Sequence, residues 1–220
     1  MNLKITKEEH DRLCSSNYKE YVFGSQLHGI ATENSDTDFI RVYDFKEVFK
    51  DESIGIFLPN IHSLQYDDVE NNSQYVWLTE EQFYRNLLSG DGNMVADVHL
   101  LSGRFYRPMR YCRTTNIIKA YLGVSKRDLK MHGYIEKKRF HAYRSLMMAE
   151  KLIDNVLPTV QDIIDLKASK LPPTEELIIL EKKLREELFE LKLPRYPVIP
   201  VADTLLTKFY DSNNINEFKY

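Results

Sequence analysis

Two aspartates separated by one residue, Asp36 and Asp38, are the side chains of this sequence best suited to chemistry. They precede and open the segment DFIRVYDF, whose alternating character is that of a β-strand, so both project from one face with Cα atoms about 6–7 Å apart. Neighbouring carboxylates repel each other, and the triplet holds no arginine to neutralise them. A divalent cation resolves this conflict, because carboxylate oxygens bind hard cations. The triplet therefore predicts a metal site, with a plain turn as the alternative, since Ser, Asp and Thr are turn formers.

A glycine–serine pair, Gly24-Ser25, ends the aromatic and β-branched segment from Tyr18 to Phe23. Glycine permits close approach of the backbone to an anion, and a turn at this point exposes N–H groups and a hydroxyl. The pair predicts a phosphate cradle that precedes the two aspartates in the chain.

The segment GSQLHGIATENSDTDF resembles the nucleotidyltransferase superfamily of DNA polymerase beta, whose signature is a strand, then GS, then a carboxylate pair on the next strand. It looks especially like a bacterial and phage group of predicted nucleotidyltransferases associated with RNA repair, written roughly GSxAYGxxTxxSDxDxxG. The residues at the positions of this pattern are Gly24, Ser25, Gly29, Thr32, Ser35, Asp36 and Asp38.

The resemblance continues beyond this motif and covers about residues 18–190. LTEEQFYRNLLSGDGN is similar to the family's helix of the type LxKFLxLLLKGNP, and KKRFHAYRSLMMAEKLI resembles its helix with the pattern KxxxHxxRL. The second match places Lys137, His141 and Arg144 on one helix face, suited to a triphosphate or a polynucleotide backbone. A solvated face with a hydrogen-bonded histidine is the alternative interpretation.

The resemblance implies transfer of a nucleoside monophosphate from a nucleoside triphosphate, ATP among them, to a hydroxyl or phosphate acceptor. In this hypothesis Gly24 and Ser25 hold the terminal phosphates, and Asp36 and Asp38 bind Mg²⁺ or Mn²⁺. The family's association implies an RNA 3′ end as acceptor, with a protein side chain or a small molecule as alternatives.

The family pattern fails at its third carboxylate, which falls near Gln74 in this sequence. Glutamine cannot act as a general base and is a poor metal ligand. Asp67, Asp68 or Glu70 could supply the acid, or the site uses two carboxylates, whereas the spacing of Asp97 suits a cap or a surface charge. The departure also motivates a second hypothesis, a binding or regulatory protein that keeps the fold without catalysis.

The charges are unevenly distributed along the chain. Residues 1–103 carry 18 Asp/Glu and 8 Lys/Arg, whereas residues 104–144 carry 2 and 12. An acidic part followed by a basic one fits a metal site opposite a surface for phosphates, although charge runs commonly only solvate a helix face. A third hypothesis, a module that binds single-stranded RNA, draws on aromatic residues within the basic stretch, which are otherwise expected in a helix core. They are Tyr106, Tyr111, Tyr121, Tyr134 and Phe140.

Periodicity predicts an α+β fold, with a small mixed-sheet lobe over residues 1–103 followed by a helical lobe with a basic face over residues 104–220. The resemblance implies that the first lobe is the nucleotidyltransferase core. Capping-box patterns begin helices at Thr6-x-x-Glu9 and Thr79-x-x-Gln82, the second ending at Gly90, and Thr174 is a plausible N-cap. Further helices are expected over 93–103, 115–122, 125–155 and 174–191, and strands over 18–23, 38–45, 73–78 and within the loop 51–72.

The bulk composition is that of a soluble globular protein, with 43% hydrophobic residues and a net charge of −3. No apolar run approaches the roughly 20 residues of a membrane span, and the first residues lack the apolar core of a secretory signal. A cytoplasmic protein without a membrane partner is expected. Cys14 and Cys112 form no CxxC, so both are expected to be free thiols.

Overall fold

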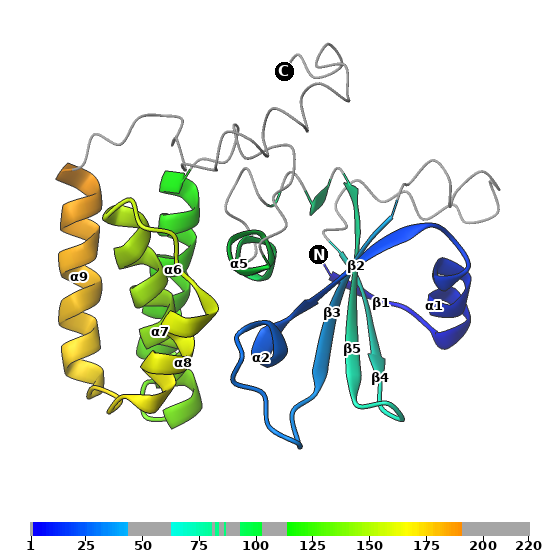
Figure 1. Cartoon of the computed structure of the whole chain (residues 1–220), viewed down its shortest axis with the longest axis horizontal. Coiled ribbons are helices and arrows are strands. Elements are labelled where there is room, and N and C mark those ends of the chain that lie inside the picture. Colours follow the sequence, from blue (N-terminus) through cyan, green and yellow to red (C-terminus); the bar gives the residue numbers. More distant parts are fainter. Residues whose placement is uncertain are drawn as a thin grey trace, which may run out of the picture.

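The computed structural model describes residues 2–43, 63–80, 82–83, 86, 93–102 and 114–190. Within these ranges the chain combines one mixed sheet with helices on both of its faces (Figure 1). The expected mixture of a sheet in the first part and helices in the second is confirmed at this level.

The strands of the described residues form one five-stranded sheet in the order β1-β4-β5-β3-β2. β2 and β3 are antiparallel, β3 and β5 are parallel, β5 and β4 form an antiparallel pair, and β1 is parallel to β4. Each expected strand is present where the structure describes it. The strands are β1 (Asn2–Lys4), β2 (Tyr18–Phe23), β3 (Thr37–Tyr43), β4 (Ser63–Asp68) and β5 (Ser73–Thr79).

Both expected capping boxes form. The Thr6 hydroxyl accepts from the Glu9 N–H while the Glu9 carboxylate accepts from the Thr6 N–H, and Thr79 and Gln82 exchange the same pair of bonds. The second helix is described at 80, 82, 83 and 86, and its expected end at Gly90 lies outside the described residues. The remaining helices are α1 (Lys7–Cys14), α2 (Gly24–Leu27), α5 (Asn93–Leu101), α6 (Thr114–His132), α7 (Glu136–Ile153), α8 (Val160–Ala168) and α9 (Thr174–Glu190).

The expected break between helices near residues 123–124 is wrong. α6 continues through Gly123, and the chain turns instead at Gly133. A Cβ on Gly133 would lie 2.6 Å from the Leu129 carbonyl oxygen and 2.7 Å from Thr174 Cγ2, so the turn needs glycine because both the end of α6 and the start of α9 approach it closely. Thr174 is the first residue of α9 rather than its N-cap, and its hydroxyl donates to the Gly133 carbonyl at 2.8 Å.

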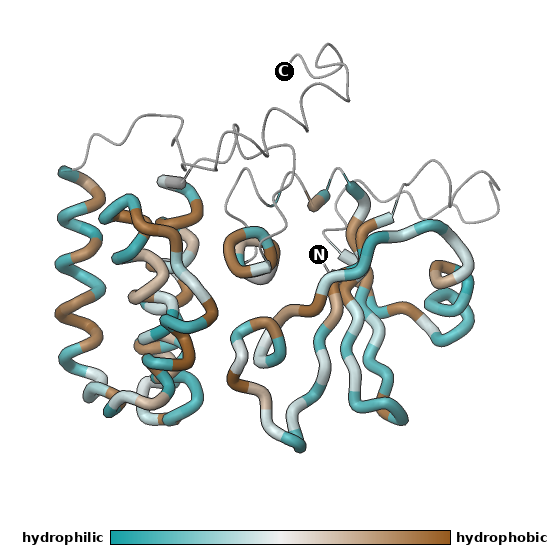
Figure 2. Tube along the Cα trace, in the orientation of Figure 1, coloured by the Kyte–Doolittle hydropathy of each residue, from teal (hydrophilic) through white to brown (hydrophobic). Residues whose placement is uncertain are grey.

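One hydrophobic cluster extends from the sheet into the helices. It includes Ile40 and Val76 on the strands and Ile118 and Leu146 on α6 and α7, all almost completely buried. The expected boundary between residues 103 and 104 lies outside the described residues, and the core is continuous across it. Figure 2 shows that the strands are hydrophobic at one end, whereas the ends of β3, β4 and β5 near Asp38 are hydrophilic. No helix in the described part of the chain is long and apolar enough to cross a membrane.

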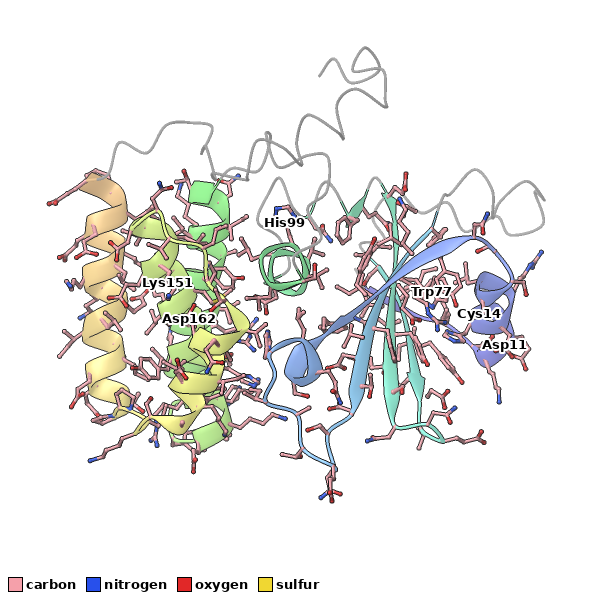
Figure 3. The ribbon with its side chains drawn as sticks, in the orientation of Figure 1. Asp11, Cys14, Trp77, His99, Lys151 and Asp162 are labelled. Atoms are coloured by element: carbon pink, nitrogen blue, oxygen red, sulfur yellow. The ribbon has the colours of Figure 1, made fainter. Side chains whose placement is uncertain are left out.

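A smaller cluster lies between the other face of the sheet and α1, where Trp77 and Cys14 lie close together (Figure 3). Arg41 is buried there: it pairs with Glu20 at 2.6 Å and donates to Cys14 Sγ at 2.9 Å. Burial raises the pKa of the Cys14 thiol more than the Arg41 charge lowers it, so this free thiol stays protonated at neutral pH. Cys112 lies outside the described residues.

Candidate active site

The glycine–serine corner lies directly against the side chain of Asp38. β2 ends at Phe23, which is in register with Asp38 on β3, and Gly24 then turns the chain into α2 with a φ angle of +66°. A Cβ on Gly24 would lie 2.2 Å from Asp38 Oδ2. Only glycine fits here, because any side chain would collide with the carboxylate and would also be strained at this φ.

Asp36 and Asp38 interact as like charges. Burial, and to a lesser extent the negative charge of Asp36, raise the pKa of Asp38 to about 6, and the positive charge of Lys137 opposes both. Asp36 is exposed just before β3, and Asp38 is partly buried on the sheet face that carries the main core. The two carboxylates thus repel each other beside the Gly24 turn, and the positive charge of Lys137 relieves part of this repulsion.

The hydroxyl of Ser25 is buried and has no hydrogen-bond partner among the described residues. Buried hydroxyls are normally satisfied, so this group needs either a water or a ligand atom. Together with two carboxylates as oxygen donors, it gives a corner whose chemistry fits a divalent cation and a phosphate oxygen. Within the described ranges, no group of three or more His, Cys, Asp or Glu side chains is suited to a metal ion.

The three residues predicted on one face of α7 have different environments. Lys137 is exposed and lies within electrostatic range of Asp38. Burial, reinforced by the charges of Arg144 and Lys138, lowers the pKa of His141 to about 4, so it is neutral at physiological pH. The Arg144 side chain is only 13% exposed and bonds within the protein. Of the three, Lys137 alone is presented to the Asp38 corner as a charge available to phosphate.

Arg144 belongs to a buried polar network that ties the end of α2 to α5, α6 and α7. Its Nη1 lies 2.6 Å from His28 Nδ1, and its Nη2 lies 3.6 Å from Asp97 Oδ2. His28 Nε2 lies 2.9 Å from the same carboxylate, and the Tyr121 hydroxyl donates to Asp97 Oδ1 at 2.5 Å. Because a guanidinium cannot accept a hydrogen bond, His28 Nδ1 must be the acceptor, which places its proton on Nε2, facing Asp97.

The structure corrects the interpretation of Asp97 as a cap or a surface charge, since this residue is 4% exposed. Burial acts to raise its pKa, but the charge of Arg144 and the bonds from His28 and Tyr121 outweigh it, so the pKa lies below its ordinary value. Its helix, NMVADVHLL, is mostly apolar, which is typical of a buried helix, and each residue from 95 to 100 is buried. A carboxylate in such a helix must be paired. That signal indicates that Asp97 is paired, but it does not identify the partners.

None of the three alternative acids reaches the Asp38 corner as a free carboxylate. Gln74 on β5 lies in register between Asp38 and Asp67, so two strand spacings, about 10 Å, separate the Cα atoms of the two aspartates. Asp67 is engaged by Gln74 Nε2 at 2.8 Å and by Lys4 at 2.7 Å. Asp68 bonds Asn71 in the turn after β4, and Glu70 is exposed in that turn.

A search against protein-family models found no match to the sequence, and no curated protein matches it either. The case for function therefore rests on the residues of the corner and on the resemblance of their motif.

Proposed function

We propose that this protein is a metal-dependent nucleotidyltransferase that moves a nucleoside monophosphate from a nucleoside triphosphate to a hydroxyl or phosphate acceptor. The observation that carries the proposal is the contact between the Gly24 turn and the Asp38 carboxylate, with Asp36 beside it. It combines a turn suited to phosphate with two close carboxylates, which is the pairing that the motif requires.

In this proposal each residue of the corner has a distinct role. Asp36 and Asp38 would hold Mg²⁺ or Mn²⁺, and the Ser25 hydroxyl would donate to a phosphate oxygen, which supplies its missing partner. A bound cation would offset the charge of the triphosphate and of the departing pyrophosphate. Lys137 would add a positive charge within electrostatic range of Asp38.

The reaction is a substitution at the α-phosphorus. An acceptor oxygen forms the new bond, the bond to the bridging oxygen breaks, and pyrophosphate leaves with that electron pair. A phosphate acceptor is already anionic and needs no base, which suits a corner that lacks a third free carboxylate among the described residues. A hydroxyl acceptor releases its proton to solvent.

The test is to incubate the protein with each of the four α-labelled nucleoside triphosphates and Mn²⁺ or Mg²⁺, and to look for label on RNA, on protein and on the enzyme itself. Asp36→Asn and Asp38→Asn should each lower the transfer rate by at least about a hundredfold, since each removes a cation ligand. Glu33→Gln is the matched control, because Glu33 is an exposed acid in the same loop. Equal loss in the control would contradict the proposal.

A protein that keeps this fold for binding or regulation is the second candidate. It is favoured by Gln74, which stands where the family pattern expects an acid and is bonded to Asp67. Absence of transfer with every triphosphate, together with absence of metal-dependent triphosphate binding, would select this candidate over the enzyme.

A further inference from the structure

A second site lies away from the Asp38 corner, at the turn between α6 and α7. It is a pocket of about 480 Å³ between the end of α6, the first turns of α7 and the start of α9. The end of α6 and the start of α9 lie at the same end of the helical part (Figure 1). The residues that matter for its chemistry are Lys130, Met131, Tyr134, Arg139, Thr174 and Glu175.

The pocket contains two positive charges that the protein does not neutralise. Arg139 Nε is buried without a hydrogen-bond partner in the described part of the chain, and neither Arg139 nor Lys130 forms an ion pair there. Among the described residues that line the pocket, Glu175 is the one acid. A buried, unpaired guanidinium nitrogen is costly, so its placement here points to an anionic ligand that is absent from the protein alone.

An exposed aromatic ring accompanies these charges. Tyr134 is 82% exposed and Met131 is 61% exposed, whereas Tyr121 and Phe140 are buried in the core. Tyr106 and Tyr111 lie outside the described residues. The surrounding stretch 126–139 holds six Lys/Arg and two Asp/Glu. A ring that faces solvent beside basic side chains is the arrangement on which proteins stack bases of single-stranded nucleic acids.

We propose that this pocket binds one nucleotide unit of a single-stranded polynucleotide, with the base stacked on Tyr134 and the phosphate between Arg139 and Lys130. Its volume lies within the range of about 300–1,000 Å³ that is usual for small-ligand sites. Arg139 and Lys130 both line the pocket, so a single phosphate that enters it can contact both side chains, whereas a flat membrane surface cannot enter it.

The pocket is distinct from the triphosphate corner. Arg139 follows Lys137 by two residues, which places the two side chains about 200° apart around α7. Lys137 interacts with Asp38, so the pocket lies on the opposite side of this helix. A strand whose end lies at Asp38 would have to pass around the start of α7 to reach it. That the pocket holds the acceptor strand of the reaction rests on the proposed function, whereas binding of a single-stranded polynucleotide does not.

The experiment measures the fluorescence anisotropy of a labelled, unstructured oligonucleotide of about 12 nucleotides, with the full chain in EDTA and without triphosphate. We expect Tyr134→Ala to lower the affinity about tenfold, since stacking of one base is lost. Lys130→Gln should lower the slope of log affinity against log salt by about one. Both side chains are exposed, so neither change should impair folding. Lys126→Gln is the control: it removes the same charge from an exposed position on α6 outside the lining.

RNA and DNA oligonucleotides are compared in parallel. Tyr134-dependent binding of either supports the proposal, and a preference for RNA identifies contacts to the 2′-hydroxyl. The proposal is overturned if Tyr134→Ala binds like the unchanged protein, if Lys126→Gln weakens binding as much as Lys130→Gln, or if anionic vesicles bind through Tyr134 and oligonucleotides do not.

Failure of this proposal can be told apart from failure of the proposed function. Asp38→Asn should bind the oligonucleotide as the unchanged protein does. Tyr134-dependent binding without any nucleotide transfer would contradict only the enzymatic proposal. Transfer to an oligonucleotide that is unaffected by Tyr134→Ala would show that this pocket does not hold the acceptor strand.

Discussion

Gly24 and Gly29 lie five residues apart, and both have a positive φ angle, but only Gly24 touches the proposed chemistry. A Cβ on Gly24 would collide with Asp38 Oδ2, whereas a Cβ on Gly29 would lie 2.8 Å from Val160 Cγ1 on α8. The two positions therefore form a matched pair at the scale of single residues. Each alanine substitution carries a similar backbone strain, and only one of them displaces a carboxylate.

We expect Gly24→Ala and Gly29→Ala each to lower the free energy of unfolding by at least about 1–2 kcal/mol, the cost of a left-handed conformation for alanine. Only Gly24→Ala should also abolish Mn²⁺-dependent transfer, because Asp38 must move. Urea denaturation and the label-transfer assay measure the two effects separately. If both variants lose transfer equally under folding conditions, displacement of Asp38 is not the cause.

At the scale of elements, the network of Asp97, Arg144, His28 and Tyr121 connects the corner to the helices. Its charges are removed from water, and its four side chains bond one another, while Arg144 Nε has no hydrogen-bond partner among the described residues. Removing one member of such a pair leaves an uncompensated buried charge, which typically costs about 3–5 kcal/mol. The network therefore holds the end of α2 in a fixed position relative to α5 and α7.

We expect Asp97→Asn to lower the free energy of unfolding by about 3–5 kcal/mol and Tyr121→Phe by about 1.5–3 kcal/mol, since the latter removes one bond to a charged group. The double variant Asp97→Asn/Arg144→Gln should have a higher free energy of unfolding than Asp97→Asn alone, because no unpaired charge remains. Urea denaturation measures these three variants and Arg144→Gln alone. If the losses in the double variant are simply additive, the two residues are not coupled.

Elements whose signals are local were predicted well from the sequence. The capping boxes at Thr6 and Thr79 need only residues three positions apart, and the strand at Tyr18–Phe23 follows from side-chain type. The helix break was misplaced because Gly123 and Gly133 look alike in sequence. What distinguishes them is Thr174, which packs on Gly133 from 41 residues away.

The candidate site likewise contains some residues with local sequence signals and others whose placement depends on distant parts of the chain. Asp36, Asp38 and Gly24 were predicted because strand alternation and a turn glycine fix their placement locally. The pairing of His28 with Asp97 spans 69 residues, so no local pattern could give it. Arg144 shares a helix face with Lys137, but it is buried because it contacts His28 at the end of α2 and Asp97 on α5.

At the scale of the whole molecule, the continuous core buries groups whose protonation differs between the folded and unfolded states. Burial lowers the pKa of His99 to about 4, and that of His141 moves in the same direction. The unfolded chain therefore binds more protons than the folded one between pH 4 and the ordinary value of 6.5, so acid favours unfolding in this window. Asp38 acts in the opposite direction, because its pKa is raised to about 6 and the folded state holds the extra proton.

We expect the metal-free protein to be most stable near neutral pH and to lose stability as the pH falls from 6.5 towards 4, with His99 contributing up to about 3 kcal/mol of the loss. Urea denaturation at several pH values in EDTA measures this slope. His99→Gln should flatten the slope, whatever its effect on stability at pH 7. Asp38→Asn should steepen it, because it removes the group whose protonation favours the folded state, and for the same reason it should stabilise the protein at neutral pH. An unchanged slope in His99→Gln would show that other groups govern acid unfolding, and a flatter slope in Asp38→Asn would contradict the raised pKa of that carboxyl.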